Sequence, residues 1–384
     1  MAAVLAAGNA YIQGRDRAMA LGPASPAQKA FYIQLVDRPD VASFFKRFSP
    51  AEKLKIAKNL RQYPDPEIIE LAEAWLNDFD APVRKELQSL LVEFAPQFPE
   101  TMAKQLKNSG GFQKVGTFAA LESQKSQSLP FVIEQLEVPE ARSNAVEYLV
   151  GLGNEVGPRV LAKLNSKEKD TQLAAADALG RMGFAAAANR LLELYRNAEG
   201  ADRSTLLASL ANLGSSESEI TFKELLVNPR TPASDRSSAI LGLGRIGSPT
   251  AISFLWRNIE KDPADKDEMI QALRLAGPAA LRSGERPINL LQVATGITGP
   301  VADQTIRKAL EIPEAQLLAT QFSESRSGLV DALVAQLRQL NPNQDGKLIE
   351  RTVASLASTP SGKKALLNFR SGPLSGFVER QLLK

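Results

Sequence analysis

The sequence predicts an all-α fold, a right-handed α-α superhelix (solenoid) built from repeated helical hairpins. Three observations predict it: a glycine that recurs at an almost fixed interval, an apolar pattern of helical period before each of these glycines, and a second apolar pattern after most of them. Successive glycines of the series are 30, 31, 33 and 30 residues apart: Gly153, Gly183, Gly214, Gly247 and Gly277. A period of this length is typical of repeat arrays, in which each unit packs mainly on its neighbours.

The first helix of each unit ends at the glycine. Apolar residues stand eight, four and one positions before it, as Ala239, Leu243 and Ile246 do before Gly247. This i, i+4, i+7 series is the buried stripe of a helix. Because the glycine takes the position where a helix C-terminus favours a left-handed residue, we expect it to be a C-cap with positive φ.

A second amphipathic helix is expected after a short turn. An apolar residue stands eight positions after the glycine in four units: Leu161, Leu191, Phe222 and Leu255. The same template, without glycine, fits earlier units around Pro64 and Ala95 and a later one that ends at Asn341. The interval between the units of Ala95 and Gly153 predicts one more hairpin, at 112–137.

The pattern breaks after Gly277, and this break sets the predicted domain boundary. Glu285 stands where the unit should have an apolar residue, so we expect its second helix to be short or irregular. The predicted organisation is an N-terminal segment and capping helix (1–44), a repeat array (45–281), and irregular C-terminal helical repeats with a cap (282–384). Residues that break a repeat are also where we expect a specialised site first.

The residues at the helix ends carry a family resemblance. Two helix ends read Leu-Gly-Arg-Met-Gly (179–183) and Leu-Gly-Arg-Ile-Gly (243–247), and one helix start reads Asp-Ala-Pro-Val-Arg (80–84). With these motifs the chain resembles a HEAT-repeat protein, and more closely the bacterial HEAT-like repeats of phycobilin-lyase type. The resemblance covers residues 45–281 well. It implies scaffolding and partner binding, although a few members of the family are enzymes.

Composition excludes several classes of chemistry. The chain has no His and no Cys, so disulfides, Cys/His zinc sites and His-dependent catalytic triads are excluded. We predict no catalytic residue, no metal site and no cofactor. No apolar run reaches the roughly 18 residues that a transmembrane helix needs. The predicted location is cytoplasmic, with a membrane-associated or a periplasmic location as the alternatives.

Charge is distributed unevenly along the chain. Residues 1–60 hold nine Lys and Arg against four Asp and Glu, and residues 361–384 hold five against one. The residues between them hold 32 against 38. Basic ends around an acidic middle argue against a long nucleic-acid groove. They are compatible with contact between the N-terminal segment and an anionic membrane surface.

Two short motifs imitate ligand sites. Residues 242–247 match the glycine pattern of a dinucleotide-binding turn, but that turn must follow a strand, whereas this segment ends a predicted helix. Residues 341–346 match the first half of a calcium loop, but the twelfth position is Thr352 instead of a carboxylate. We therefore expect a helix end and an inter-helix turn with an Asp cap.

Three arginines near helix ends are the candidate partner-binding residues. Arg181, Arg245 and Arg274 fall at nearly equivalent repeat positions. Their side chains could therefore form a row along one surface that binds carboxylates or phosphates. The competing interpretation is that each neutralises its own helix C-terminus. Three acid–arginine pairs are interpreted as ties within a repeat: Asp80/Arg84, Asp202/Arg203 and Asp235/Arg236.

The leading functional hypothesis is a non-enzymatic scaffold or adaptor that holds a protein partner, of unknown identity, along its concave, second-helix surface. Two alternatives stay open. One is an enzyme of HEAT-like type, either a bilin lyase or a DNA glycosylase. The other is a peripheral membrane protein that docks through its N-terminal segment.

Overall fold

A computed structural model describes residues 26–36, 48–78, 80–108, 110–284, 287–297, 299–309 and 327–382. Within these ranges every regular element is helical, as the sequence predicts. None of the described helices is long and apolar enough to cross a membrane. The chain divides into two compact units, Met1–Met182 and Gly183–Lys384. This division falls inside the predicted array 45–281, and the predicted domain boundaries stay predictions.

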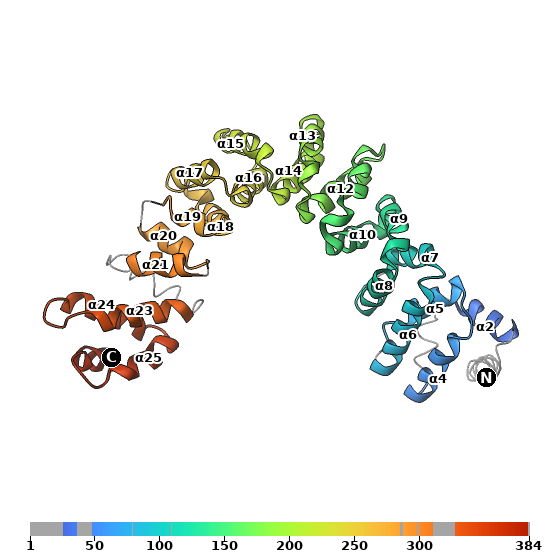
Figure 1. Cartoon of the computed structure of the whole chain (residues 1–384), viewed down its shortest axis with the longest axis horizontal. Coiled ribbons are helices and arrows are strands. Elements are labelled where there is room, and N and C mark those ends of the chain that lie inside the picture. Colours follow the sequence, from blue (N-terminus) through green and yellow to red (C-terminus); the bar gives the residue numbers. More distant parts are fainter. Residues whose placement is uncertain are drawn as a thin grey trace, which may run out of the picture. The chain divides into compact units, whose positions relative to one another are not determined.

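Unit 1 contains antiparallel hairpins (Figure 1). Its α-helices are α2 (Pro26–Val36), α4 (Pro50–Leu60), α5 (Pro66–Trp75), α6 (Ala81–Phe94), α7 (Pro99–Lys104), α8 (Phe112–Ser123), α9 (Lys125–Glu134), α10 (Pro139–Leu152), α11 (Gly157–Leu161) and α12 (Lys169–Met182). Short 3₁₀ helices extend or join them: η1 (Gln105–Asn108), η2 (Gln135–Glu137), η3 (Gly153–Val156) and η4 (Ala162–Asn165). Helices α8 and α9 form the hairpin predicted at 112–137.

Unit 2 continues with the same type of hairpin. Its α-helices are α13 (Ala188–Asn197), α14 (Gly200–Leu213), α15 (Glu219–Val227), α16 (Ala233–Ile246), α17 (Pro249–Asn258), α18 (Lys266–Leu275), α19 (Pro278–Leu281), α20 (Pro287–Ala294), α21 (Pro300–Ala309), α23 (Ser327–Gln339), α24 (Gly346–Ala357), α25 (Pro360–Leu366) and α26 (Ser375–Leu382). The 3₁₀ helices are η5 (Ala185–Ala187), η6 (Ser216–Ser218), η7 (Pro263–Asp265) and η8 (Leu367–Phe369).

The predicted left-handed C-cap is confirmed at two of the five glycines, and the positive φ at all five. All five glycines of the series have positive φ, between 58° and 75°. Gly214 and Gly247 are left-handed C-caps, and the N–H of each donates to the carbonyl four residues before it. Gly277 precedes α19 with φ 70°. An L-residue adopts this backbone region only with strain, which explains why glycine recurs where the chain turns from the first helix to the second.

The predicted apolar stripes form the core. The residues before the glycines are largely buried, and those of the second helices include Leu191, Phe222 and Leu255, each with 0% exposure. First helices pack on first helices in both units, as α4 packs on α6 and α14 on α16, and in unit 1 second helices pack on second helices, as α7 packs on α9. Each hairpin therefore buries its apolar faces against the next hairpin in the row, which is the packing of a HEAT-like repeat.

Small residues bring the first helices of unit 2 close together. A Cβ at Gly244 would lie 2.6 Å from Cα of Ala272 in α18, and one at Gly242 would lie 2.7 Å from Cζ of Phe222 in α15. These two glycines of the dinucleotide-like motif therefore serve packing between helices, and the segment ends α16, as predicted. In unit 2, α14, α16 and α18 lie on the inner side of the row and α13, α15 and α17 on the outer side (Figure 1). The assignment of the concave face to the second helices is wrong within this unit, because the closely spaced first helices occupy the inner side.

The repeat break and the calcium-like turn also have structural explanations. The second helix after Gly277 is α19, which has four residues and is short, as predicted. Glu285 itself lies outside the described residues. At the turn, Asn341 N–H donates to the Asp345 carboxylate (2.8 Å), and Thr352 is buried in α24. The segment 341–346 is therefore an inter-helix turn closed by its aspartate.

Candidate functional site

The three candidate arginines have different surroundings. Arg181, in α12 of unit 1, is 3.4 Å from the carboxylate of Asp177 on its own helix. Arg245 donates to the carbonyl of Asn212 in α14 (3.3 Å), and Arg274 donates to the carbonyl of Gln292 in α20 (2.6 Å). The last two side chains thus bond the backbone of a neighbouring helix in unit 2. A role in partner binding stays a prediction for all three.

A second set of cations links successive repeats. These side chains stand at the fourth residue of a first helix: Lys53, Arg84, Arg142, Arg203 and Arg236. Arg142 donates to the Leu136 carbonyl (2.9 Å) and pairs with Asp170 one repeat later (3.2 Å). Arg236 donates to the Leu226 carbonyl (3.0 Å) and pairs with Asp262 and Asp265. The predicted ties within a repeat are wrong for Arg236, because the long guanidinium side chain reaches into the next hairpin.

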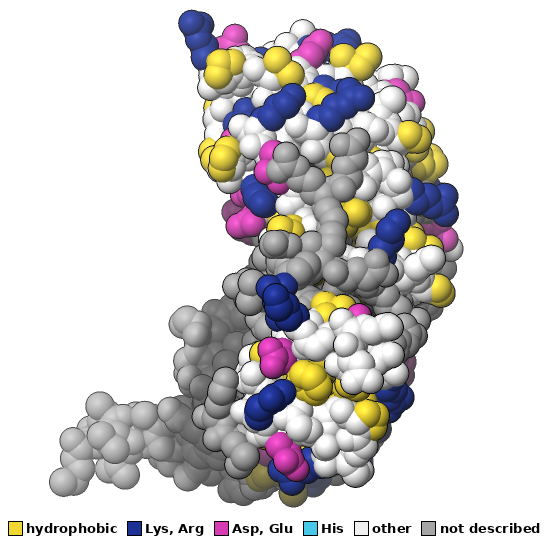
Figure 2. Space-filling view, turned by 90° about the vertical axis from the view of Figure 1, so that its left-hand side faces the viewer, with side chains coloured by type: hydrophobic (Ala, Val, Ile, Leu, Met, Phe, Trp, Pro, Cys, Tyr) yellow, Lys and Arg dark blue, Asp and Glu magenta, His cyan; other side chains and the backbone are white. Residues whose placement is uncertain are grey.

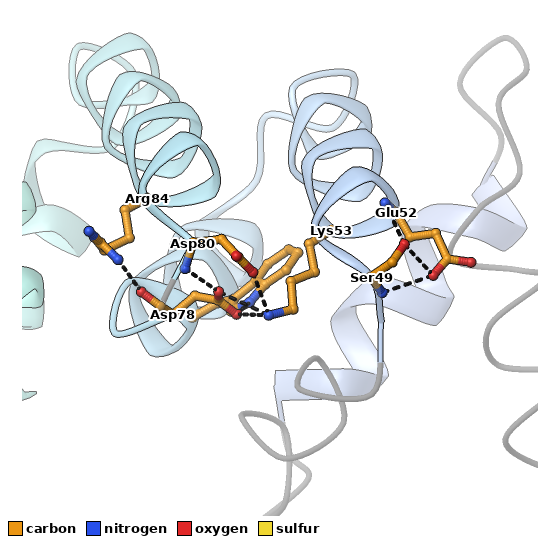
Figure 3. Close-up of polar contacts among 7 residues, drawn as sticks. Ser49, Glu52, Lys53, Asp78, Asp80 and Arg84 are labelled. Atoms are coloured by element: carbon orange, nitrogen blue, oxygen red, sulfur yellow. Dashed lines mark hydrogen bonds and ion pairs between the residues drawn. The ribbon is translucent and has the colours of Figure 1, made fainter.

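The Lys53 site shows this tie most completely (Figure 3). The Lys53 ammonium lies 2.8 Å from a carboxylate oxygen of Asp78 and 2.8 Å from one of Asp80. The Trp75 indole N–H also donates to Asp78 (3.0 Å). Arg84 donates to the Asp78 backbone carbonyl (2.6 Å) and not to Asp80, so the predicted Asp80/Arg84 pair is wrong as well. Asp80 is the N-cap residue of α6 and pairs with the cation of the preceding repeat.

Opposed effects set the charge states at this site. Burial alone would lower the pKa of Lys53, but its contacts with Asp78 and Asp80 hold that pKa above the usual value. Burial alone would raise the pKa of Asp78, but the ammonium of Lys53 and the N–H groups of Asp80 and Trp75 hold it below the usual value. Both groups are therefore charged at neutral pH, in a site where the two side chains are only 8% and 3% exposed.

Arg84 and Arg203 depart from the pattern, since neither pairs with a carboxylate among the described residues. The acid partners of Lys53 and Arg236 include the N-cap residue of the next first helix, Asp80 or Asp265. After Arg203 the corresponding N-cap residue is Pro232, which has no acceptor in its side chain. Arg203 instead lies over the ring of Tyr195, 4.7 Å from its centroid, and donates to the Tyr195 hydroxyl (3.2 Å). Among the described residues no carboxylate pairs with it, so the predicted Asp202/Arg203 tie is wrong.

A groove of about 430 Å³ lies beside this arginine, between α13 and α15. One group of lining residues comes from α13 and the start of α14: Tyr195, Arg196 and Arg203. The other comes from η6, α15 and its C-cap: Glu217, Ile220, Thr221, Glu224, Leu225 and Asn228. The groove thus combines two guanidinium groups, two carboxylates and an apolar wall.

Two exposed apolar side chains stand on α15, and one of them, Ile220, lines the groove. Ile220 is 71% exposed and Val227 is 73% exposed, the two highest values among the large apolar side chains of the described residues. They are seven residues apart, so they share one face of the helix. Single exposed apolar residues are common, whereas two on one helix face, one of them lining a groove, form a candidate docking surface. We call this pair the α15 stripe. Sequence reasoning missed it because an i, i+7 apolar pair also fits a buried position.

A smaller cavity, of about 200 Å³, lies at the repeat break. Its lining residues are Ser253, Trp256, Arg257, Ile259, Glu260, Ser283 and Asn289. The Trp256 indole N–H donates to the Ala280 carbonyl (2.9 Å), and the Asn289 amide donates to Glu260 (2.6 Å). The cavity lies where α19 is too short to cover α17, in the region where the sequence predicts a specialised site.

Surface charge is mixed. On the face that Figure 2 shows, the described Lys and Arg side chains are spread singly or in small groups and are interrupted by acidic and apolar side chains. The described part of this face therefore has no continuous basic strip of the kind that follows a nucleic-acid backbone. The described residues also contain no group of three or more Asp and Glu arranged to hold a metal ion.

Glu73 is a buried carboxyl group between α5 and α8. It is 1% exposed and accepts hydrogen bonds from Gln113 (3.0 Å) and Thr117 (3.3 Å). Burial raises the pKa of Glu73 to about 7, although the bonds from Thr117 and Gln113 and the charge of Lys107 act in the opposite direction. The packing of α5 on α8 therefore depends on a group that titrates near neutral pH.

We expect this carboxyl group to make stability pH-dependent. The folded-state pKa of about 7 lies above the ordinary value of 4.5, so the folded chain binds more protons between these values. The stabilisation is complete below pH 4.5 and is lost as pH rises through 7, by about 3 kcal/mol at most. Glu73→Gln should make the free energy of unfolding less dependent on pH in this range, as measured by urea titrations at several pH values. Glu70→Gln, exposed on the same helix, is the control, and an equal effect of both variants would contradict the assignment.

No family model and no curated protein sequence matches the chain. Among solved structures it is similar to human deoxyhypusine hydroxylase in complex with glycerol, with 17% identity and a TM-score of 0.29. The match covers 68% of this chain and 97% of that one. The HEAT-like repeat fold is assigned from the order of the helices, the glycines with positive φ between them and the packing of successive hairpins.

Proposed function

We propose that this chain is a non-enzymatic scaffold that binds a protein partner through the α15 stripe and the adjoining groove. The observation that carries the proposal is the exposure of Ile220 and Val227, above 70% for both, on one face of a well-packed helix. Covering two such side chains removes apolar surface from water, which favours association by about 25 cal/mol per Å². The groove beside them supplies charged groups that can orient the partner.

The proposed fold around this surface is a right-handed superhelix of the phycobilin-lyase-related HEAT type. Its support is the constant order of first and second helices with their glycine caps. A repeat row of this kind presents its second helices side by side, so a partner can contact several of them at once. The proposed surface lies mainly on second helices, and on the outer side of unit 2 instead of the concave side that the sequence predicts.

Partner capture with matched variants tests the function. Tagged chain carrying Ile220→Asp with Val227→Asp should retain its bound proteins at least tenfold less than the wild-type chain, measured by quantitative mass spectrometry after crosslinking in the native cells. The control is Leu275→Asp with Leu367→Asp, because these side chains are also exposed, at 53% and 48%. If both double variants capture equal amounts of the bound proteins, the α15 stripe is not the binding surface. The melting temperature should change little in either variant, since the substituted side chains are exposed.

A further inference from the structure

Arg203 is an inter-repeat cation that pairs with no carboxylate among the described residues. Lys53 and Arg236 each pair with the N-cap aspartate of the next first helix, whereas Pro232 stands at that position after Arg203. The guanidinium stacks on Tyr195 and donates from Nη2 to its hydroxyl, and no described residue accepts from its other N–H groups. Stacking fixes the plane of the group, so little side-chain entropy remains to be lost when an anion binds.

Arg196 provides a second positive charge in the same groove. Its side chain is exposed, and no described residue forms an ion pair with it. Two guanidinium groups that line one groove are well suited to a carboxylate, which accepts bidentate hydrogen bonds. The apolar side chains of Ile220 and Leu225 line the groove as well.

The acidic residues of the groove select against a polyanion. Glu217 accepts hydrogen bonds from the hydroxyls of Ser215 and Ser216, and the first of these holds the pKa of Glu217 below its usual value. Glu224 is exposed and also lines the groove. A chain of phosphates would be repelled by these two carboxylates, whereas a peptide can place one carboxylate at the arginines and other groups at Glu224.

We infer that the groove binds a peptide segment of the partner in which an Asp or Glu side chain stands next to an apolar side chain. The carboxylate pairs with Arg203 and Arg196, and the apolar side chain packs on Ile220 and Leu225. This inference depends on the proposed function and specifies the chemistry of the partner at the same site. In physical terms, the partner's carboxylate takes the place of the N-cap aspartate that the next repeat lacks.

One substitution can restore the missing acid without removing either arginine. Pro232→Asp places a carboxylate where Asp80 and Asp265 stand in the other ties, and Asp is also a favoured N-cap residue. We expect Arg203 to pair with it. The variant should then melt at a higher temperature than the wild-type chain and bind the peptide roughly tenfold more weakly, because the new carboxylate competes for the guanidinium.

The test is selection from a phage-displayed random peptide library on the full chain, followed by fluorescence anisotropy with the selected peptides. Selected peptides should contain Asp or Glu beside an apolar residue. Their binding should weaken roughly tenfold in Arg203→Met and in Pro232→Asp. It should be unchanged in the control Arg230→Met, an exposed arginine that does not line the groove.

Peptides without acidic residues, or equal binding by the wild-type chain and Arg203→Met, would overturn the inference. So would displacement of the peptides by a single-stranded oligonucleotide that binds the chain more tightly. If peptide binding is lost in the Ile220→Asp/Val227→Asp chain but kept in Arg203→Met, the proposed function stands. Only the inference that the peptide binds through a carboxylate then fails. If no peptide is selected, the inference fails, and capture from native cells decides the proposed function separately.

Discussion

Replacing Lys53 by Met should lower the free energy of unfolding of the helices around α4 by about 3 kcal/mol, because it leaves the buried Asp78 without its countercharge. The side chains of Lys53 and Asp78 are 8% and 3% exposed, so water cannot replace the ammonium. The Trp75 indole and the Asp80 backbone N–H still donate to Asp78, which keeps the loss below the full cost of an isolated buried ion. The loss should appear in the urea transition that hydrogen exchange assigns to α4–α6, since repeat arrays need not unfold in one step.

Two controls separate this ion pair from general effects of substitution. Lys58→Met changes an exposed lysine of the same helix and should shift the transition by less than about 0.5 kcal/mol. Lys53→Met combined with Asp78→Asn removes both charges and should cost clearly less than the sum of the single variants. If the losses in free energy of unfolding of the two single variants add up to the loss of the double variant, Lys53 and Asp78 do not interact. Lys53 would then contribute to stability only through packing.

Replacing Gly244 by Ala should destabilise unit 2 by about 2 kcal/mol, although Gly→Ala inside a helix normally stabilises by about 1 kcal/mol. The added methyl group would meet the backbone of Ala272 in α18, 2.6 Å from its Cα, and backbone cannot rotate away as a side chain can. The helices α16 and α18 would have to separate, which opens the packing on both sides of the contact.

Gly151→Ala is the matched control for Gly244→Ala. Gly151 also lies in a first helix, α10, but nothing stands within 4 Å of its added Cβ. We expect this variant to be more stable than the wild-type chain by up to about 1 kcal/mol. Opposite signs for the two substitutions, measured by urea unfolding, would establish that position 244 is occupied by glycine for packing. A gain in stability at both positions would contradict the close approach of α16 and α18.

The sequence was sufficient to predict the hairpins because their cause is local. The spacing of Leu210 and Leu213 before Gly214 specifies a buried stripe and a left-handed cap without reference to any other repeat. The same reasoning located the hairpin of α8 and α9 from interval length alone. It also anticipated a short second helix after Gly277, because a charged residue at a core position cannot be buried there.

The candidate site could be predicted only in part, because it depends on which repeat a long side chain reaches. Sequence proximity paired Arg236 with Asp235, whereas the guanidinium reaches Asp262 and Asp265 in the next hairpin. The α15 stripe was hidden because exposure depends on the neighbouring helices and not on the helix itself. A signal for Arg203 was nevertheless available, since Pro232 stands where two other repeats have an aspartate.

The ties between repeats join residues that are close in the sequence, and this affects how the chain folds during its synthesis. Lys53 pairs with Asp78 25 residues later, Arg142 with Asp170 28 residues later, and Arg236 with Asp265 29 residues later. Each of these ties joins residues that are close in the sequence. The entropy lost in closing each loop is therefore small and similar from hairpin to hairpin. On the ribosome, each hairpin can therefore become ordered once the following one has emerged, and the C-terminal residues are not needed for the first hairpins to fold.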